Sequence, residues 1–152
     1  MTLAVLAVLA PVSGRVVDLA LVPDPVFAAG MVGPGRAVDP DRGPSVAVAP
    51  VTGRVLKAHP HAFVVVSADG RGVLVHLGID TVELKGEGFE LLVEEGAAVA
   101  AGDPVVRWDP AAVEAGGRSP SCPVVALDAS PGALAWQDAD RVEAGAELFR
   151  WS

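Results

Sequence analysis

The chain has 152 residues, 51% of them hydrophobic, and a formal net charge of −8 at pH 7. These values exclude a disordered or collagen-like chain and are sufficient for a single domain, 1–152, with a buried core. With 11 Lys and Arg against 19 Asp and Glu, the charge also argues against a nucleic-acid or anionic-membrane partner, because both require clustered positive charge.

The first ten residues, Met1–Ala10, resemble the apolar part of a secretion signal. However, no Lys or Arg precedes them, and their end belongs to a repeated motif, so we expect a folded strand. No run of apolar residues approaches the length of a membrane span. We therefore expect a cytoplasmic protein that is not inserted in a membrane.

Glycine and proline interrupt the chain too often for long helices. The 17 Gly and 13 Pro separate valine-rich segments, and valine favours strands. The pattern predicts an all-β fold of short strands and tight turns. Helix is expected only as short turns at Val26–Ala29 and Phe89–Glu95, and at Pro110–Ala115 with Gly116 as its cap.

Two internal echoes indicate duplication within this β-domain. The motif Ala10–Val17 (APVSGRVV) recurs at Ala49–Leu56 (APVTGRVL), and Glu94–Val106 is echoed by Val142–Phe149, each with glycine in a turn before an apolar strand. The stretch Gly30–Gly43 between the repeats is expected to be a loop. Its glycines are interpreted as turn residues with positive φ, because a phosphate-binding loop would need a Lys-Ser/Thr end and a following helix.

Single tryptophans and one cysteine are interpreted as packing residues. Trp108, Trp136 and Trp151 stand apart among apolar neighbours, which favours core or edge packing over a stacking platform. Cys122 has no metal-binding or redox spacing around it and is expected to be a buried small side chain.

A predicted hairpin brings two histidines together. The strand-like runs His61–Ser67 and Gly72–Leu77 flank an Asp-Gly turn signal at 69–70. If these two residues form the whole loop, His61 and His76 become diagonal neighbours on one face. A three-residue loop would place them on opposite faces.

The second run of this hairpin alternates in a way that exposes His76. Val73, Val75 and Leu77 are expected to face the core, which leaves Leu74 and His76 on the accessible face.

All three histidines, His59, His61 and His76, lie in this region. A neutral imidazole can act as a nucleophile when its other N–H is held, and a second imidazole can donate a hydrogen bond to a developing anion. The residues alone leave three possibilities open: phosphoryl transfer through phosphohistidine, metal binding, or a structural pair.

Seven collinear segments carry a resemblance to a known family: Ala10–Gly14, Val22–Phe27, Met31–Gly33, Ala49–Val51, His61–Phe63, Val75–Phe89 and Gly102–Val105. Together they resemble the glucose-type enzyme IIA (EIIA) of the bacterial phosphoenolpyruvate:sugar phosphotransferase system. The run Val75–Phe89 (VHLGIDTVELKGEGF) is the most specific of them.

This resemblance implies a compact antiparallel β-sandwich with internal duplication, the duplicated hybrid motif. It implies a phosphotransferase component without a cofactor, in which His76 accepts a phosphoryl group at Nε2 from the phosphocarrier HPr. His76 then passes the group to the IIB domain of an IIB/IIC sugar permease during sugar uptake, with His61 as the supporting histidine. The residues implied to bind these partners are Asp24, Phe27, Leu74, Asp80 and Val82.

The site chemistry expected from this resemblance is mostly positioning and charge stabilisation. Backbone N–H groups near Gly78–Thr81 and the His61 ring are expected to stabilise the phosphoryl oxygens. Asp80 would repel phosphate, so we expect it to pair with an Arg of the partner. One position departs from the family: His59 stands where many members have Thr, and we expect it to face solvent or to help only slightly.

Two other functions remain open. His59 and His61 with His76 resemble a three-histidine zinc site, although zinc peptidases of similar fold have a further His before the pair. No metal is required by the family resemblance, and zinc on His61 and His76 would be incidental.

A binding or carrier module is the other possibility, but Lys57 and Lys85 do not sit at an exposed hairpin tip as in biotinyl and lipoyl carriers. A regulatory role, the sugar, and whether the chain stands alone or belongs to a larger permease are not readable from the sequence.

Overall fold

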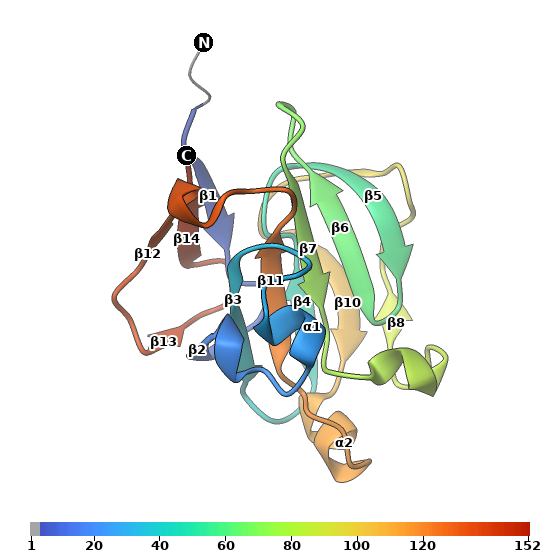
Figure 1. Ribbon diagram of the computed structural model, residues 1–152. Helices are drawn as coiled ribbons and strands as arrows, with labels where there is room; N and C mark the ends of the chain where they lie inside the picture. Colours follow the sequence, from blue (N-terminus) through green and yellow to red (C-terminus); the bar gives the residue numbers. More distant parts are fainter. Residues whose placement is uncertain (1–3) are drawn as a thin grey trace.

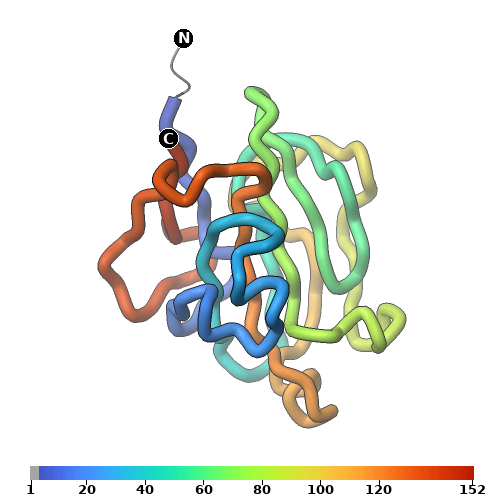
Figure 2. The backbone as a smooth tube through the Cα atoms, viewed as in Figure 1, coloured from blue at the N-terminus to red at the C-terminus, as the bar shows by residue number. Residues whose placement is uncertain are grey.

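The computed structural model describes residues 4–152, and strands dominate it (Figures 1 and 2). The strands are β1 (Leu6–Leu9), β2 (Gly14–Asp18), β3 (Gly35–Pro40), β4 (Ser45–Val48), β5 (Gly53–His59), β6 (Ala62–Val66), β7 (Gly72–His76), β8 (Glu90–Leu91), β9 (Ala98–Val99), β10 (Pro104–Trp108), β11 (Cys122–Ala126), β12 (Leu134–Trp136), β13 (Arg141–Val142) and β14 (Glu147–Trp151). The prediction of a strand within Met1–Ala10 is confirmed by β1, and residues 1–3 lie outside the described residues.

The helices within the described residues are short. They are α1 (Pro25–Ala28), α2 (Pro110–Ala115) and the 3-10 turns η1 (Leu19–Leu21), η2 (Thr81–Leu84) and η3 (Pro131–Ala133). Two of the three predicted helical segments are confirmed. In α2 the Asp109 carboxylate accepts a hydrogen bond from the Ala111 N–H at 2.9 Å, and Gly116 is the C-cap.

The strands form three antiparallel sheets whose order reveals the duplication. The large sheet runs β13-β2-β3-β11-β7-β6-β5-β9, and the two small sheets run β1-β14-β12 and β4-β10-β8. The half-sheet β13-β2-β3-β11 thus repeats as β9-β5-β6-β7, and each small sheet repeats the other. This is the all-β, internally duplicated sandwich that the sequence predicts.

Backbone hydrogen bonds show that the two sequence repeats occupy equivalent places. The Ala10 N–H donates to Ala146 O at 2.7 Å, and the Ala49 N–H donates to Asp103 O at 2.8 Å. Ala10 O and Ala49 O each accept a bond of 2.9 Å from a turn glycine, Gly145 and Gly102 respectively. Both glycines have positive φ, 85° and 92°, and each precedes a strand of a small sheet, as the second echo predicts.

Two apolar clusters lie on opposite faces of the large sheet. The main core fills the space between the sheets and includes Val73, Val75 and Val124, all fully buried. A smaller cluster lies on the outer face, where η1 and α1 cross β3, β11 and β7 (Figure 1). Its buried members are Leu19, Val22, Phe27, Ala37, Ile79 and Val125.

Two predictions of secondary-structure type are wrong. Phe89–Glu95 is not helical, because Glu90 and Leu91 pair with β10 as strand β8, and the 3-10 turn η2 lies earlier in the chain. Gly30–Gly43 is not wholly a loop, because β3 occupies its centre. Gly30 and Gly33 do have positive φ, but Gly35 is a strand residue, and a Cβ there would lie 2.0 Å from Val124 O.

The packing interpretation of the tryptophans and the cysteine is confirmed. Trp108 and Trp151 are buried, whereas Trp136 is exposed on edge strand β12 and packs against the Phe149 ring at 5.6 Å between centroids. Cys122 is fully buried, and burial raises the pKa of its thiol to about 12. This thiol is therefore a packing group and not a reactive one.

Candidate functional site

His76 is the last residue of β7, and the strand directs its side chain to the outer face. Val73 and Val75 are fully buried in the main core, so Leu74 and His76 between and after them face the other way. Leu74 packs against the smaller apolar cluster. The faces predicted for this strand are confirmed.

A backbone hydrogen bond fixes the tautomer of His76. Its Nδ1 lies 2.5 Å from the carbonyl oxygen of Gly78. A carbonyl oxygen can only accept, so Nδ1 carries the hydrogen and donates it. The lone pair of the neutral ring is therefore on Nε2, which is the atom able to attack an electrophile.

The loop after β7 is shaped to present that carbonyl. Gly78 has φ 82°, and a Cβ there would lie 2.7 Å from Thr81 Cγ2 and 3.1 Å from Ser119 O, so glycine is needed. Buried Thr81 donates its hydroxyl to Leu77 O at 2.8 Å, and the Ile79 N–H donates to Ser119 O at 2.8 Å. The Ile79 N–H is thus already engaged, which corrects part of the expectation that N–H groups of this loop serve a phosphoryl group.

The His61 ring contacts the His76 ring, but the register of the two strands differs from the predicted one. Strand β6 pairs with β7 with Ala62 opposite His76 and Val66 opposite Gly72. The Ser67 N–H donates to Arg71 O at 2.9 Å, so the loop has three residues, 68–70, and the predicted two-residue loop is wrong.

This register shift does not separate the histidines, because His61 is not a strand residue. It lies in the two-residue turn between β5 and β6, whose last pair is His59 with Ala62. A turn residue is released from strand alternation, and the His61 and His76 rings meet edge to face with centroids 5.3 Å apart and an interplanar angle of 74°. The predicted histidine pair is therefore present.

His59 is part of the same arrangement. Its ring stacks on the His61 ring with centroids 5.8 Å apart and an interplanar angle of 27°. His59 is exposed, as expected, but this contact was not predicted. The residues of the site that sequence reasoning missed are His59 as a stacking partner, Thr81 and Ser119.

The residues expected to bind partners lie on α1 and its N-cap, on β7, and on η2 and its N-cap. Asp24 caps α1 by accepting hydrogen bonds from the N–H groups of Val26 and Phe27 at 2.9 and 3.3 Å. The Phe27 ring contacts His76 edge to face, with centroids 5.3 Å apart. Around η2, Asp80 is exposed with φ 58°, and the Val82 side chain is 60% exposed.

Burial controls the charge state of both rings. It lowers the pKa of His76, and this outweighs the opposing influences of the hydrogen bond to Gly78, Asp24 and Asp80. Burial also lowers the pKa of His61, with smaller contributions from repulsion by His76 and His59. Both rings are therefore neutral at neutral pH, which is the state in which an imidazole nitrogen can act as a nucleophile.

Only one of the two half-sheets carries this pair of histidines. In the half with β6 and β7, Ala62 lies opposite His76 and follows His61. In the other half, Gly35 of β3 lies opposite Val125 of β11 and follows Pro34. Val125 and Pro34 thus stand where His76 and His61 stand, and the duplicated fold contains the histidine pair once.

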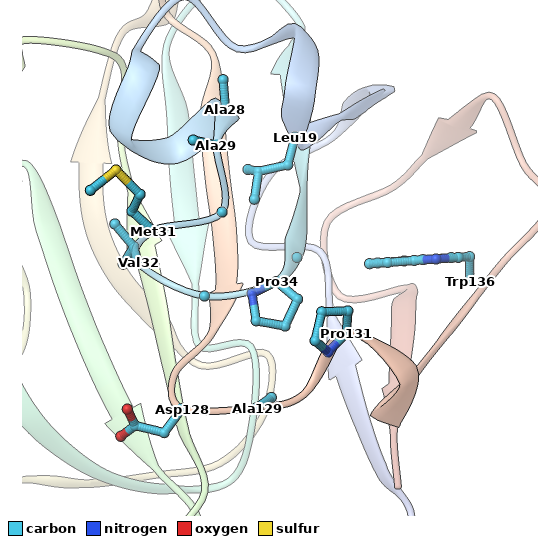
Figure 3. A pocket seen from close by; sticks show the side chains of 13 residues that line it. Leu19, Ala28, Ala29, Met31, Val32, Pro34, Asp128, Ala129, Pro131 and Trp136 are labelled. Atoms are coloured by element: carbon cyan, nitrogen blue, oxygen red, sulfur yellow. The ribbon is translucent and has the colours of Figure 1, made fainter.

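A separate hollow of about 460 Å³ lies beside α1 (Figure 3). Its walls include Leu19, Ala29, Met31, Pro34 and Trp136, and among the described residues that line it only Asp128 is charged. None of the three histidines contributes to it. The candidate site is therefore the open surface around His76 and not this hollow.

The histidines do not form a three-ligand metal centre. Within residues 4–152, no group of three His, Cys, Asp or Glu side chains could hold a metal ion. The stacked rings of His59 and His61 account for this, since ligands of one zinc ion converge on a point. The three-histidine zinc hypothesis is therefore not supported.

A family model supplies the decisive comparison. The model described as "phosphoenolpyruvate-dependent sugar phosphotransferase system, EIIA 1" matches residues 6–131. The chain belongs to this EIIA family. It is thus a component of a sugar phosphotransferase system, and it has no helix within residues 4–152 that is long and apolar enough to cross a membrane.

Relatives and a solved structure agree with this membership. A "PTS system glucose-specific EIIA component" from Bacillus cereus is 40% identical over 120 residues, which are 78% of this chain and 72% of the relative. A "PTS system N-acetylglucosamine-specific EIICBA component" from Klebsiella pneumoniae is 44% identical over 78% of this chain and 18% of its own length. The structure titled "Glucose permease IIA from Mycoplasma capricolum" matches with a TM-score of 0.89 and 33% identity over 99% of both chains.

Proposed function

We propose that this EIIA protein carries a phosphoryl group on Nε2 of His76 during sugar uptake. The group arrives from phospho-HPr and leaves to the IIB domain of an IIB/IIC permease. The observation that supports this best is the hydrogen bond from His76 Nδ1 to the Gly78 carbonyl oxygen, because it reserves Nε2 for attack. These partners belong to the bacterial cytoplasm, where we propose that the protein acts.

The transfer step needs few protein groups. The Nε2 lone pair of His76 attacks phosphorus, a new N–P bond forms, and the bond from phosphorus to the donor breaks with its electron pair returning to the donor. Neutral His61 keeps one ring N–H, which donates to a phosphoryl oxygen from beside the His76 ring. Phe27 and the neighbouring apolar side chains exclude water that would hydrolyse the phosphohistidine.

The rim of the site fits partners that bring positive charge and an apolar surface. Asp24 and Asp80 lie close enough to His76 to influence its pKa. Leu74 is half-buried beside the small cluster, and Val82 is exposed. We propose that Arg side chains of HPr and IIB pair with the two carboxylates, while apolar partner residues cover Phe27, Leu74 and Val82.

The relatives do not identify one particular sugar as the transported substrate. One relative is named as glucose-specific and another as N-acetylglucosamine-specific. The proposal is therefore limited to sugar uptake, with the cognate permease as the component that selects the sugar.

Phosphorylation by purified components tests the proposal. Incubation with phosphoenolpyruvate, enzyme I and HPr is expected to add one acid-labile phosphoryl group to the wild-type protein and none to His76→Ala. Thermal unfolding shows whether the variant is folded. A phosphoryl group that is still added to folded His76→Ala would contradict the assignment of His76 as the acceptor.

A second variant separates the roles of the two histidines. His61→Gln is expected to accept the phosphoryl group from HPr, because the His76 nucleophile is intact, but to pass it to IIB more slowly. The rates of the two half-reactions measure this directly. Wild-type rates in both half-reactions would remove the role proposed for His61.

A further inference from the structure

His59, Ala62 and His76 form one row across three strands. His59 pairs with Ala62, and Ala62 pairs with His76, so their side chains project from the same face of the sheet. The central member of the row is a methyl group, which leaves space between the two outer rings. The His61 ring lies within this space, 5.8 Å from His59 and 5.3 Å from His76 between ring centroids.

The backbone of His61 is tied to the sheet, whereas its ring is contacted by two neighbouring rings. His61 lies in the turn between β5 and β6, and its carbonyl oxygen accepts a hydrogen bond from the Leu77 N–H at 2.7 Å. His76 meets the His61 ring edge to face, whereas His59 lies nearly parallel to it, with an interplanar angle of 27°.

We propose that His59 is a positioning residue: its stacked ring holds the plane of His61 in the orientation that donates a hydrogen bond to a phosphoryl group on His76. This inference rests on the proposed function. Repulsion from His59 also contributes to lowering the pKa of His61, so the same contact favours the neutral ring. Because His59 is exposed, its replacement removes the contact without opening a cavity in the core.

The test compares three variants in both half-reactions. His59→Ala removes the stacked ring, and we expect phosphorylation from HPr to the wild-type extent but transfer to IIB about ten-fold slower, since small misplacements of catalytic groups have large effects on rate. His59→Phe keeps a flat ring and is expected to restore transfer to IIB. Leu56→Ala, at another exposed position on the same strand, is the control and is expected to behave as wild type.

A spectroscopic signature separates positioning from a general loss of structure. Stacking on His59 places the His61 ring protons in its ring current, so their NMR shifts are expected to move in His59→Ala and to stay shifted in His59→Phe, with the melting temperature unchanged. Wild-type transfer by His59→Ala, or failure of His59→Phe to restore it, would overturn the inference. Failure of the wild-type protein to accept phosphate would instead refute the proposed function.

Discussion

Three residues set the tautomer of the His76 ring for the proposed attack on phosphorus. Gly78 supplies the carbonyl that holds Nδ1–H, while Thr81 and Ser119 anchor the loop that presents it. Preparing the tautomer before the donor arrives removes a rearrangement from the transfer step. Burial then keeps the ring neutral.

This burial predicts how stability depends on pH. The pKa values of His76 and His61 are lowered in the folded protein, so the unfolded chain binds protons first as the pH falls below about 6.5. The stabilisation is present above that pH and is lost as the pH falls through the folded-state pKa values. Urea unfolding across this range is expected to show a smaller pH-dependent loss in His76→Ala than in the wild type. An equal loss in the two proteins would contradict the buried, neutral state of His76.

The histidine pair was predictable from sequence, but its geometry was not. The residue types and the Asp-Gly turn led to the correct two rings through an incorrect loop length. The Ser67 N–H bonds Arg71 O, and Arg71 is further held by Asp69 and by the carbonyl oxygen of Trp151 at 2.7 Å. The last of these contacts joins residues 80 positions apart, which a local turn rule does not include.

Among the elements, α1 links the fold to the site because it carries both Asp24 and Phe27. It has four residues, too short to be stable without tertiary packing. It is held by the Asp24 cap and by burial of Phe27 in the small cluster.

The sequence identified α1 and α2 because proline, a capping aspartate and glycine are local signals. It failed for β3 and β8, which form by pairing with distant strands.

Substitution of Asp24 separates its cap from its charge. Asp24→Ala is expected to lower the free energy of unfolding by about 1 kcal/mol through loss of the cap, whereas Asp24→Asn keeps a capping oxygen and most of that stability. Both variants lose the carboxylate and are expected to react more slowly with phospho-HPr. Chemical unfolding and kcat/KM measure the two effects. An Asn variant that reacts as fast as wild type would show that the charge of Asp24 does not contribute to docking.

On the scale of the whole molecule, a duplicated fold carries a single histidine pair and a strongly acidic surface. The repeat of Ala10–Val17 at Ala49–Leu56 predicted the duplication, because equivalent motifs make equivalent bonds. The order of strands in the large sheet was not predictable, since β11 and β7 join the two halves through residues that lie 49 to 53 positions apart in the sequence. The net charge of −8 favours encounter with a positively charged partner.

The charge predicts a salt-dependent rate of phosphorylation. Raising NaCl from about 0.05 to about 0.5 M shortens the distance over which charges act, so kcat/KM for transfer from phospho-HPr is expected to fall several-fold. Single-turnover rates with saturating phospho-HPr are expected to change little. A kcat/KM that does not respond to salt would exclude electrostatic attraction as a factor in docking.

The nitrogen that carries the phosphoryl group tests the central claim most directly. After phosphorylation of ¹⁵N-histidine-labelled protein, NMR coupling between phosphorus and nitrogen identifies the modified atom. Because Nδ1 donates to Gly78 O, coupling is predicted to Nε2 of His76 alone. Coupling to Nδ1 of His76, or to a nitrogen of His61 or His59, would contradict the mechanism.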